Sequence, residues 1–173
     1  MRRFLVVAHQ TLASRELLAA MKAKAKEEET VFYLVVPIHH GEPGLTWTEG
    51  HDRAVAERRL KEAQLRMTAD GVTVAGEVGS DSPVDSVDEV LRREGAENFA
   101  GIIVSTLPRN VSKWLKLDVP SRIQRKTTLA VDHLIGHPVT ANGLARHAGQ
   151  RRDKARRNGH NVAAQRRVWG RAR

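Results

Sequence analysis

The sequence predicts an α/β fold, a Rossmann-like open sheet of five mostly parallel strands with helices on both faces. Short apolar, β-branched runs, of which 101–104 (GIIV) is the clearest, alternate along the chain with segments whose apolar residues recur at helical spacing. Strands that alternate with helices become parallel neighbours joined by right-handed crossovers. The apolar runs also stop at polar or Pro-containing stretches, as buried strands do where they lead into loops.

The first half of the chain supplies two strands and two helices. Residues 4–8 (FLVVA) predict the first strand, and Ser14 is a suitable N-cap for a helix with apolar residues at helical spacing between 17 and 25. The second strand is expected over 31–36, before Pro37. A long loop, 38–50, then leads to a helix marked by Ala56, Leu60, Ala63 and Met67 and closed by Gly71.

The second half continues the alternation. Residues 72–78 predict a more polar strand, which suits a sheet edge. Asp81 or Ser82 caps the next helix, with Pro83 in its first turn and Gly95 just past its end. The buried strand 101–104 follows, then a polar loop and a short helical segment, and residues 127–131 (TTLAV) predict the last strand.

The charge of the chain divides it into two parts. Residues 135–173 hold ten Lys or Arg and one acid, Asp153, so the formal net charge of +9 lies entirely in this part. It has few large apolar residues and cannot bury enough surface to offset the entropy cost of ordering. We therefore expect a domain over 1–135 and a flexible Arg-rich tail over 136–173.

Such a tail suits a polyanion, and RNA or the ribosome is a candidate partner, because cations neutralise phosphates and a tryptophan can stack on a base. The alternative is a solubilising tail with no selected partner. Anionic membranes are not expected as partners, since the tail has no apolar helical face to insert. The candidate nucleic-acid-binding residues are Arg151, Arg152, Lys154, Arg156, Arg157, Arg166, Arg167, Trp169 and Arg171.

Composition excludes several classes of function. The chain has no cysteine, which removes thiol catalysis and thiolate metal sites and fits a reducing compartment. It has no apolar run of about eighteen residues, and the expectation is a soluble cytoplasmic protein. Neither a Gly-x-Ser-x-Gly elbow nor a Gly-x4-Gly-Lys-[Ser/Thr] loop is present, so no catalytic residue and no enzymatic activity are expected.

Polar residues gather where two central strands end. Ligands bind outside the carboxyl ends of the strands in open α/β sheets, which makes this edge the first candidate site. Hydroxyls, an amide and two cations could hold a small anion or a nucleotide there. The alternative is that these residues are ordinary caps, turn formers and solvated charges. The candidate ligand-binding residues are His9, Gln10, Thr11, Ser105, Thr106, Arg109, Ser112 and Lys113.

Two further features have ordinary explanations. Imidazole and carboxylate groups suit zinc or nickel, but no His-x3-His pair supports a site among His39, His40, His51 and Asp52, so no metal is expected. Trp114 lies between two lysines and could stack on a base, although we expect it in the core or at a dimer contact.

The stretches GEVGSDSPVDSVDEVLRREGAENFAGIIVS and RIQRKTTLAVDHL, with the N-terminal strand that ends in a polar turn, resemble the universal stress protein family over residues 2–134. The resemblance implies the five-stranded fold, a role in stress survival and a homodimer formed through the last strand.

The nucleotide-binding branch of that family carries Gly-x2-Gly-x9-Gly followed by Ser or Thr. Here Ser105, Pro108, Asp118 and Val119 stand at these positions, and His9 stands where the family usually has Asp. Phosphate loops use backbone N–H groups at close approach, and Pro108 has none to offer. ATP binding in the family manner is therefore not expected, and no cofactor is predicted.

The leading hypothesis is a non-enzymatic stress-response protein that binds a partner or a small ligand. The alternatives are an RNA- or ribosome-associated factor anchored by the tail, and an ATP-binding stress protein of the ordinary family kind.

Overall fold

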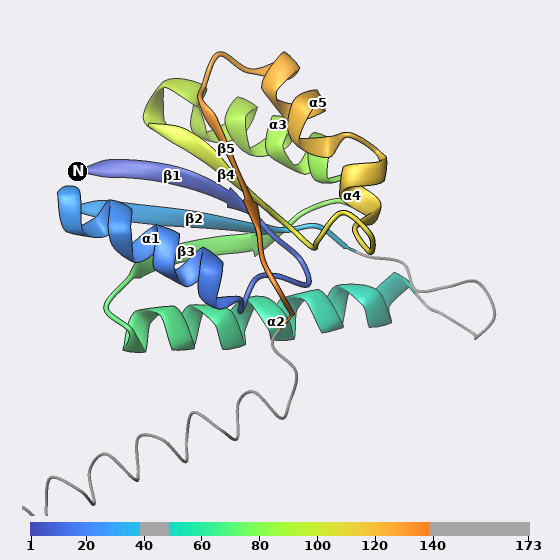
Figure 1. The fold of residues 1–173 in the computed structure, drawn as a ribbon, viewed down its shortest axis with the longest axis horizontal. Helices are drawn as coiled ribbons and strands as arrows, with labels where there is room; N and C mark the ends of the chain where they lie inside the picture. Colours follow the sequence, from blue (N-terminus) through green and yellow to red (C-terminus); the bar gives the residue numbers. More distant parts are fainter. Residues whose placement is uncertain (39–48, 139–173) are drawn as a thin grey trace, which may run out of the picture. The chain divides into compact units, whose positions relative to one another are not determined.

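The computed structural model describes residues 1–38 and 49–138. One compact unit spans Met1–Pro138. The tail and its nine candidate residues lie outside the described residues, and the division of the chain at residue 135 stays a prediction. The elements are β1 (Arg2–Val7), α1 (Arg15–Glu27), β2 (Thr30–Val36), α2 (Glu49–Ala69), β3 (Thr73–Val78), α3 (Pro83–Glu94), η1 (Ala96–Asn98), β4 (Gly101–Thr106), α4 (Lys113–Lys116), α5 (Val119–Lys126) and β5 (Val131–Ile135) (Figure 1).

The strands form one parallel sheet in the order β3-β2-β1-β4-β5. This confirms the predicted Rossmann-like α/β fold, and β3 lies at an edge as its polar sequence predicted. Val7 pairs with Val35 of β2 on one side and with Val104 of β4 on the other. The chain therefore leaves β1 in one direction and returns to its other side with β4, which makes the β1–β4 boundary the switch point where a ligand crevice forms.

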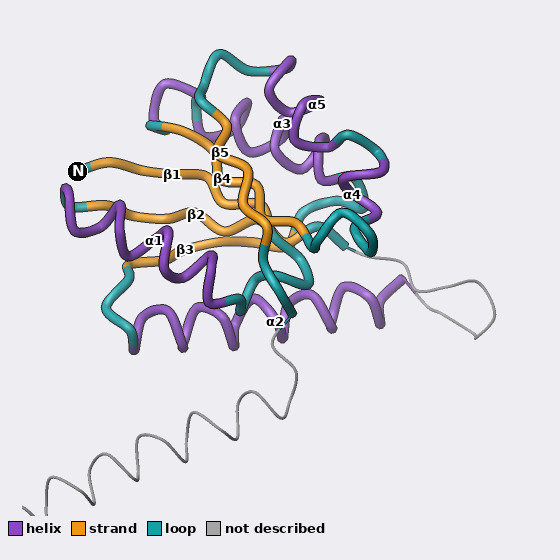
Figure 2. The backbone as a smooth tube through the Cα atoms, in the orientation of Figure 1, coloured by secondary structure: helices purple, strands orange, loops and turns teal. Residues whose placement is uncertain are grey.

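Alternating side chains of the central strands supply two separate cores. Phe4 and Val6 pack in one apolar cluster with residues of α1 and α2. Leu5 and Val7 pack in the other with residues of α3 and α5. Figure 2 shows the helices of these two groups on opposite sides of the strands. Because both faces of the central strands are covered, their sequences are continuous apolar runs and not alternating ones.

Local capping fixes two of the helices where the sequence predicted. The Ser14 hydroxyl accepts a hydrogen bond from the Leu17 N–H at 3.2 Å, and the Ser82 hydroxyl accepts one from the Asp85 N–H at 3.3 Å. These bonds satisfy backbone donors that the first turn leaves without partners. Gly95 ends α3 with a φ of 83°, a conformation that glycine adopts at little cost.

The position of the last strand was predicted wrongly. The strand expected over 127–131 begins only at Val131. Thr127 is the C-cap of α5, and the Gln124 side chain bonds both the Leu129 carbonyl at 3.0 Å and the Val131 N–H at 3.2 Å. The intervening residues therefore turn the chain from helix to strand, and the β-branched run TTLAV belongs mostly to this turn.

Among the helices of the described residues, none has the length and apolar character needed to cross a bilayer.

Candidate functional site

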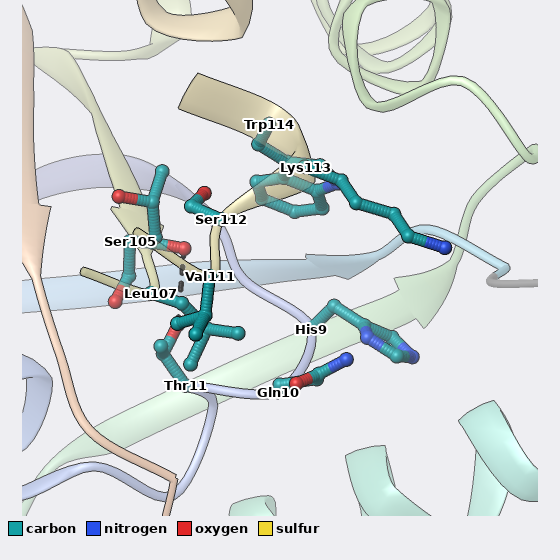
Figure 3. Close-up of a pocket in the computed structure, with 10 residues that line it drawn as sticks. His9, Gln10, Thr11, Ser105, Leu107, Val111, Ser112, Lys113 and Trp114 are labelled. Atoms are coloured by element: carbon teal, nitrogen blue, oxygen red, sulfur yellow. Dashed lines mark hydrogen bonds between the residues drawn. The ribbon is translucent and has the colours of Figure 1, made fainter. Parts of the chain in front are cut away.

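A pocket of about 190 Å³ lies at the switch point of the sheet (Figure 3). Three segments far apart in sequence form it: the turn after β1, the end of β4 with the residue that follows it, and the first residues of α4 with the loop before them. Its lining residues are His9, Gln10, Thr11, Ser105, Thr106, Leu107, Val111, Ser112, Lys113 and Trp114.

The structure brings together seven of the eight residues predicted for this site. The exception is Arg109, which is exposed and does not line the pocket. The Pro108 carbonyl accepts hydrogen bonds from the N–H groups of Val111 and Ser112 at 3.0 and 2.9 Å, and Arg109 lies within this tight turn. The role of the other seven as ligand contacts stays a prediction.

Sequence reasoning did not assign the apolar part of the lining. Leu107 and Val111 belong to the loop after β4, and Trp114 is the second residue of α4, after Lys113. Trp114 is half-buried and packs against the core cluster that α3 and α5 cover, as expected of a core residue, and it also forms part of the pocket. An apolar wall therefore faces the polar groups.

Two hydrogen bonds hold the pocket walls. The hydroxyl of Thr11 donates to the Ser105 carbonyl oxygen at 3.0 Å and ties the turn after β1 to the end of β4 (Figure 3). The Ser112 hydroxyl accepts from the Leu115 N–H at 3.1 Å and fixes the start of α4. Since Thr11 and Ser112 are 1 % and 2 % exposed, these bonds are shielded from water. The site is thus held before any ligand arrives.

The Ser105 hydroxyl is the one buried side-chain polar atom of the described residues that has no hydrogen-bond partner. Buried polar groups are nearly always paired with protein, water or ligand. Ser105 is 1 % exposed and belongs to the pocket lining. Its unpaired hydroxyl marks this end of the site as one where a further polar partner would be favourable.

The charge of the pocket is positive. Within residues 1–38 and 49–138, no Asp or Glu lines it, whereas Lys113 does and is exposed. Arg59 of α2 lies 3.0 Å from the His9 Nε2 atom. A guanidinium only donates hydrogen bonds, so His9 Nε2 is the acceptor in this contact. Arg59 was missed because nothing in the sequence distinguishes it from the other cations of α2.

Thr106 connects the site to the edge strand. Its hydroxyl lies 2.8 Å from His133 Nε2 on β5. Partial desolvation of the ring lowers the pKa of His133, because it disfavours the charged form, although the residue as a whole is exposed at the sheet edge. His133 was also missed, since the predicted strand ended two residues before it.

The positions of the family glycine motif differ from one another in backbone geometry. Asp118 has a φ of 53° and is the only non-glycine residue of the described chain with positive φ. Pro108 contributes a carbonyl acceptor to its turn and has no N–H. Val119 is buried at the start of α5. At the third glycine position of the motif, Asp118 thus keeps a backbone conformation that glycine favours. At the second position, Pro108 removes the N–H donor that a phosphate would need.

The metal hypothesis receives no geometric support from the residues that the structure describes. In 1–38 and 49–138, no group of three His, Cys, Asp or Glu side chains lies close enough to hold an ion. His39 and His40 lie outside these ranges.

Comparison with known proteins gives structural similarity alone. No model of a known protein family and no curated protein sequence matches the chain. A universal stress protein family structure from Burkholderia pseudomallei is similar with a TM-score of 0.51 and 22% identity, covering 76% of this chain and 94% of that one. A universal stress protein from Archaeoglobus fulgidus has a TM-score of 0.50 and 16% identity, covering 77% and 93%. The chain therefore has the fold of these universal stress protein structures, as its sequence resemblance predicted.

Proposed function

We propose that this chain is a non-enzymatic protein of the universal stress protein type that binds a small ligand at the switch point of its sheet. The observation that carries this proposal is the pocket itself, held by the Thr11–Ser105 hydrogen bond and containing a buried, unpaired hydroxyl. A role in the stress response and a cytoplasmic location belong to the same proposal, supported by the shared fold and by the absence of cysteine.

The hydroxyls of the pocket are poorly placed for catalysis. Thr11 donates to a carbonyl and Ser112 caps a helix, so neither faces a base. Thr106 has an imidazole partner in His133, but no acid is bonded to that imidazole among the described residues. A nucleophile needs a base that is itself oriented by a third group.

ATP fits the pocket poorly. Sites for drug-sized ligands occupy roughly 300–1,000 Å³, whereas this pocket measures about 190 Å³. The loop also lacks the N–H at Pro108. We expect no thermal stabilisation of the full chain by ATP-Mg, and a shift of several degrees would favour the ordinary nucleotide-binding alternative.

Mass spectrometry of small molecules released from the freshly purified, denatured protein tests the proposal without assuming a ligand. A compound in near-stoichiometric amount that is absent after a Thr11→Val substitution would support it. An adenine nucleotide in that amount would contradict the argument from Pro108.

A homodimer through β5 is a further part of the proposal. β5 is an edge strand of the sheet, and an edge strand presents unpaired backbone groups to another chain. Light scattering during size-exclusion chromatography would give the mass, for which twice the monomer value of 19.2 kDa is expected.

RNA or ribosome association is the second candidate function. It is favoured by the location of the net charge of +9, all of it beyond residue 134. Deleting residues 139–173 should lower RNA affinity and flatten its dependence on salt, because fewer counterions are released. Equal binding by the shortened chain would overturn this alternative.

A further inference from the structure

We infer that the pocket selects a compact organic anion, a carboxylate or similar oxyanion on a short apolar body. This inference rests on the proposed ligand-binding function and specifies the chemistry of the ligand. It follows from the charge, the hydrogen-bond donors, the apolar wall and the size of the site.

The charges around the pocket favour an anion and oppose a cation. The lining, as far as the structure describes the chain, contains Lys113 and no carboxylate. Arg59 adds a second cation through its 3.0 Å contact with His9, which itself lines the pocket. A bound anion would thus meet Lys113 directly and have Arg59 behind His9, with no acid of the described lining to repel it.

Hydroxyl protons are available to such an anion. The Ser112 hydroxyl accepts the bond that caps α4, which leaves its proton for another acceptor. The Ser105 hydroxyl is buried in the pocket lining and has no partner among the residues that the structure describes. Hydrogen bonds from neutral donors to an ionised acceptor are stronger than those between neutral groups. An oxyanion therefore suits these donors better than a neutral carbonyl.

The apolar wall requires an apolar portion in the ligand. Leu107, Val111 and Trp114 line the pocket together with the polar residues (Figure 3). Val111 is 57 % exposed and is one of few large apolar side chains that the described chain leaves open to water. Covering such a surface with an apolar group of the ligand stabilises the complex. The volume of about 190 Å³ restricts this portion to a small ring or a short chain.

Benzoate and benzamide are a matched pair of probes, because they share the ring and differ in charge. Binding of each to the full-length protein should be measured by calorimetry or by ligand-observed NMR. We expect benzoate to bind at least tenfold more tightly than benzamide. Lys113→Met should weaken benzoate at least tenfold, and Arg59→Gln several-fold.

Neighbouring cations provide the control variants. Lys116 lies on the same short helix as Lys113, and Arg58 adjoins Arg59 on α2. Both residues are exposed and outside the pocket lining, so Lys116→Met and Arg58→Gln serve as controls. Both controls should bind benzoate like the unaltered protein. Circular dichroism and thermal melting confirm that all four variants are folded.

The outcomes separate this inference from the function on which it rests. Equal affinity for benzoate and benzamide, or equal loss of benzoate affinity in Lys113→Met and Lys116→Met, would contradict the selection of an anion. Either result would leave the proposal of small-ligand binding unaffected. Absence of binding by both probes would also contradict the inference that the pocket selects a compact organic anion. If, in addition, no small molecule is released from the purified protein, the proposed function itself falls.

Discussion

The hydrogen bond between Thr11 and Ser105 offers a direct test of how the site is held. Thr11→Val replaces a hydroxyl with a methyl group of similar size, so it removes the bond without opening a cavity. The lost donor served a buried carbonyl oxygen at 3.0 Å, and Thr11 is 1 % exposed. Water cannot easily take the place of this donor.

The expected loss of unfolding free energy is about 1–2 kcal/mol. A typical intramolecular hydrogen bond contributes about 0.5–1.5 kcal/mol net, and a buried polar group left without its partner costs about 1–3 kcal/mol. The valine methyl group regains part of this loss by apolar burial. With a urea m-value of about 1.5–2 kcal/mol/M for a domain of this size, the midpoint should fall by roughly 0.5–1.3 M.

Urea denaturation followed by far-ultraviolet circular dichroism measures this shift. Thr11→Ser is the matched control, because it keeps the donor and loses only a methyl group. It should lose less free energy than Thr11→Val. If valine unfolds at the same midpoint as threonine with an unchanged m-value, the bond does not stabilise the site, and the account of preformed pocket walls is wrong.

Three further substitutions test other parts of the structure. Asp118→Gly should raise the free energy of unfolding by up to about 1 kcal/mol in urea titration, since glycine relieves a left-handed conformation but loses more chain entropy; a loss would contradict this. Gly76→Ala should cost about 1–3 kcal/mol, because its Cβ would meet the Leu34 carbonyl, whereas Gly50→Ala, with open space, should cost nothing. The pKa of His133 is lowered on folding, so below pH 6.5 the unfolded chain binds more protons than the folded chain. The free energy of unfolding therefore decreases as the pH is lowered. His133→Gln should make this pH dependence weaker, as measured by Tm at a series of pH values. An unchanged dependence would mean that other groups cause it.

The central strands could be predicted because burial on both faces leaves a strong mark on sequence. Every residue of β4 is buried, and GIIV is correspondingly apolar. The last strand lies at an edge, where exposed positions such as Asp132 and His133 carry polar side chains. Its sequence is thus less apolar than the turn before it, and local pattern placed the strand four residues too early.

The site was predictable to the extent that topology determines it. Residues that follow adjacent parallel strands must meet at one edge, which brought Thr11 and Ser105 together without knowledge of any contact. Arg59 and His133 reach the site from a helix and an edge strand, 50 and 27 residues away from the partners they contact. Contacts of this kind depend on helix rotation and strand register, for which the single sequence carries no marker.

The loop after β4 is better described as rebuilt than as a damaged phosphate loop. A phosphate loop points backbone donors at its ligand. Here the Pro108 carbonyl organises the turn by accepting two N–H groups, at 3.0 and 2.9 Å. These donors are consumed by the protein itself, and restoring glycine at Pro108 alone would not free them. Under the proposed function, recognition is therefore left to side chains, namely Lys113, the serine hydroxyls and the wall around Trp114. Side chains of that kind suit a small charged ligand with an apolar body better than a chain of phosphates.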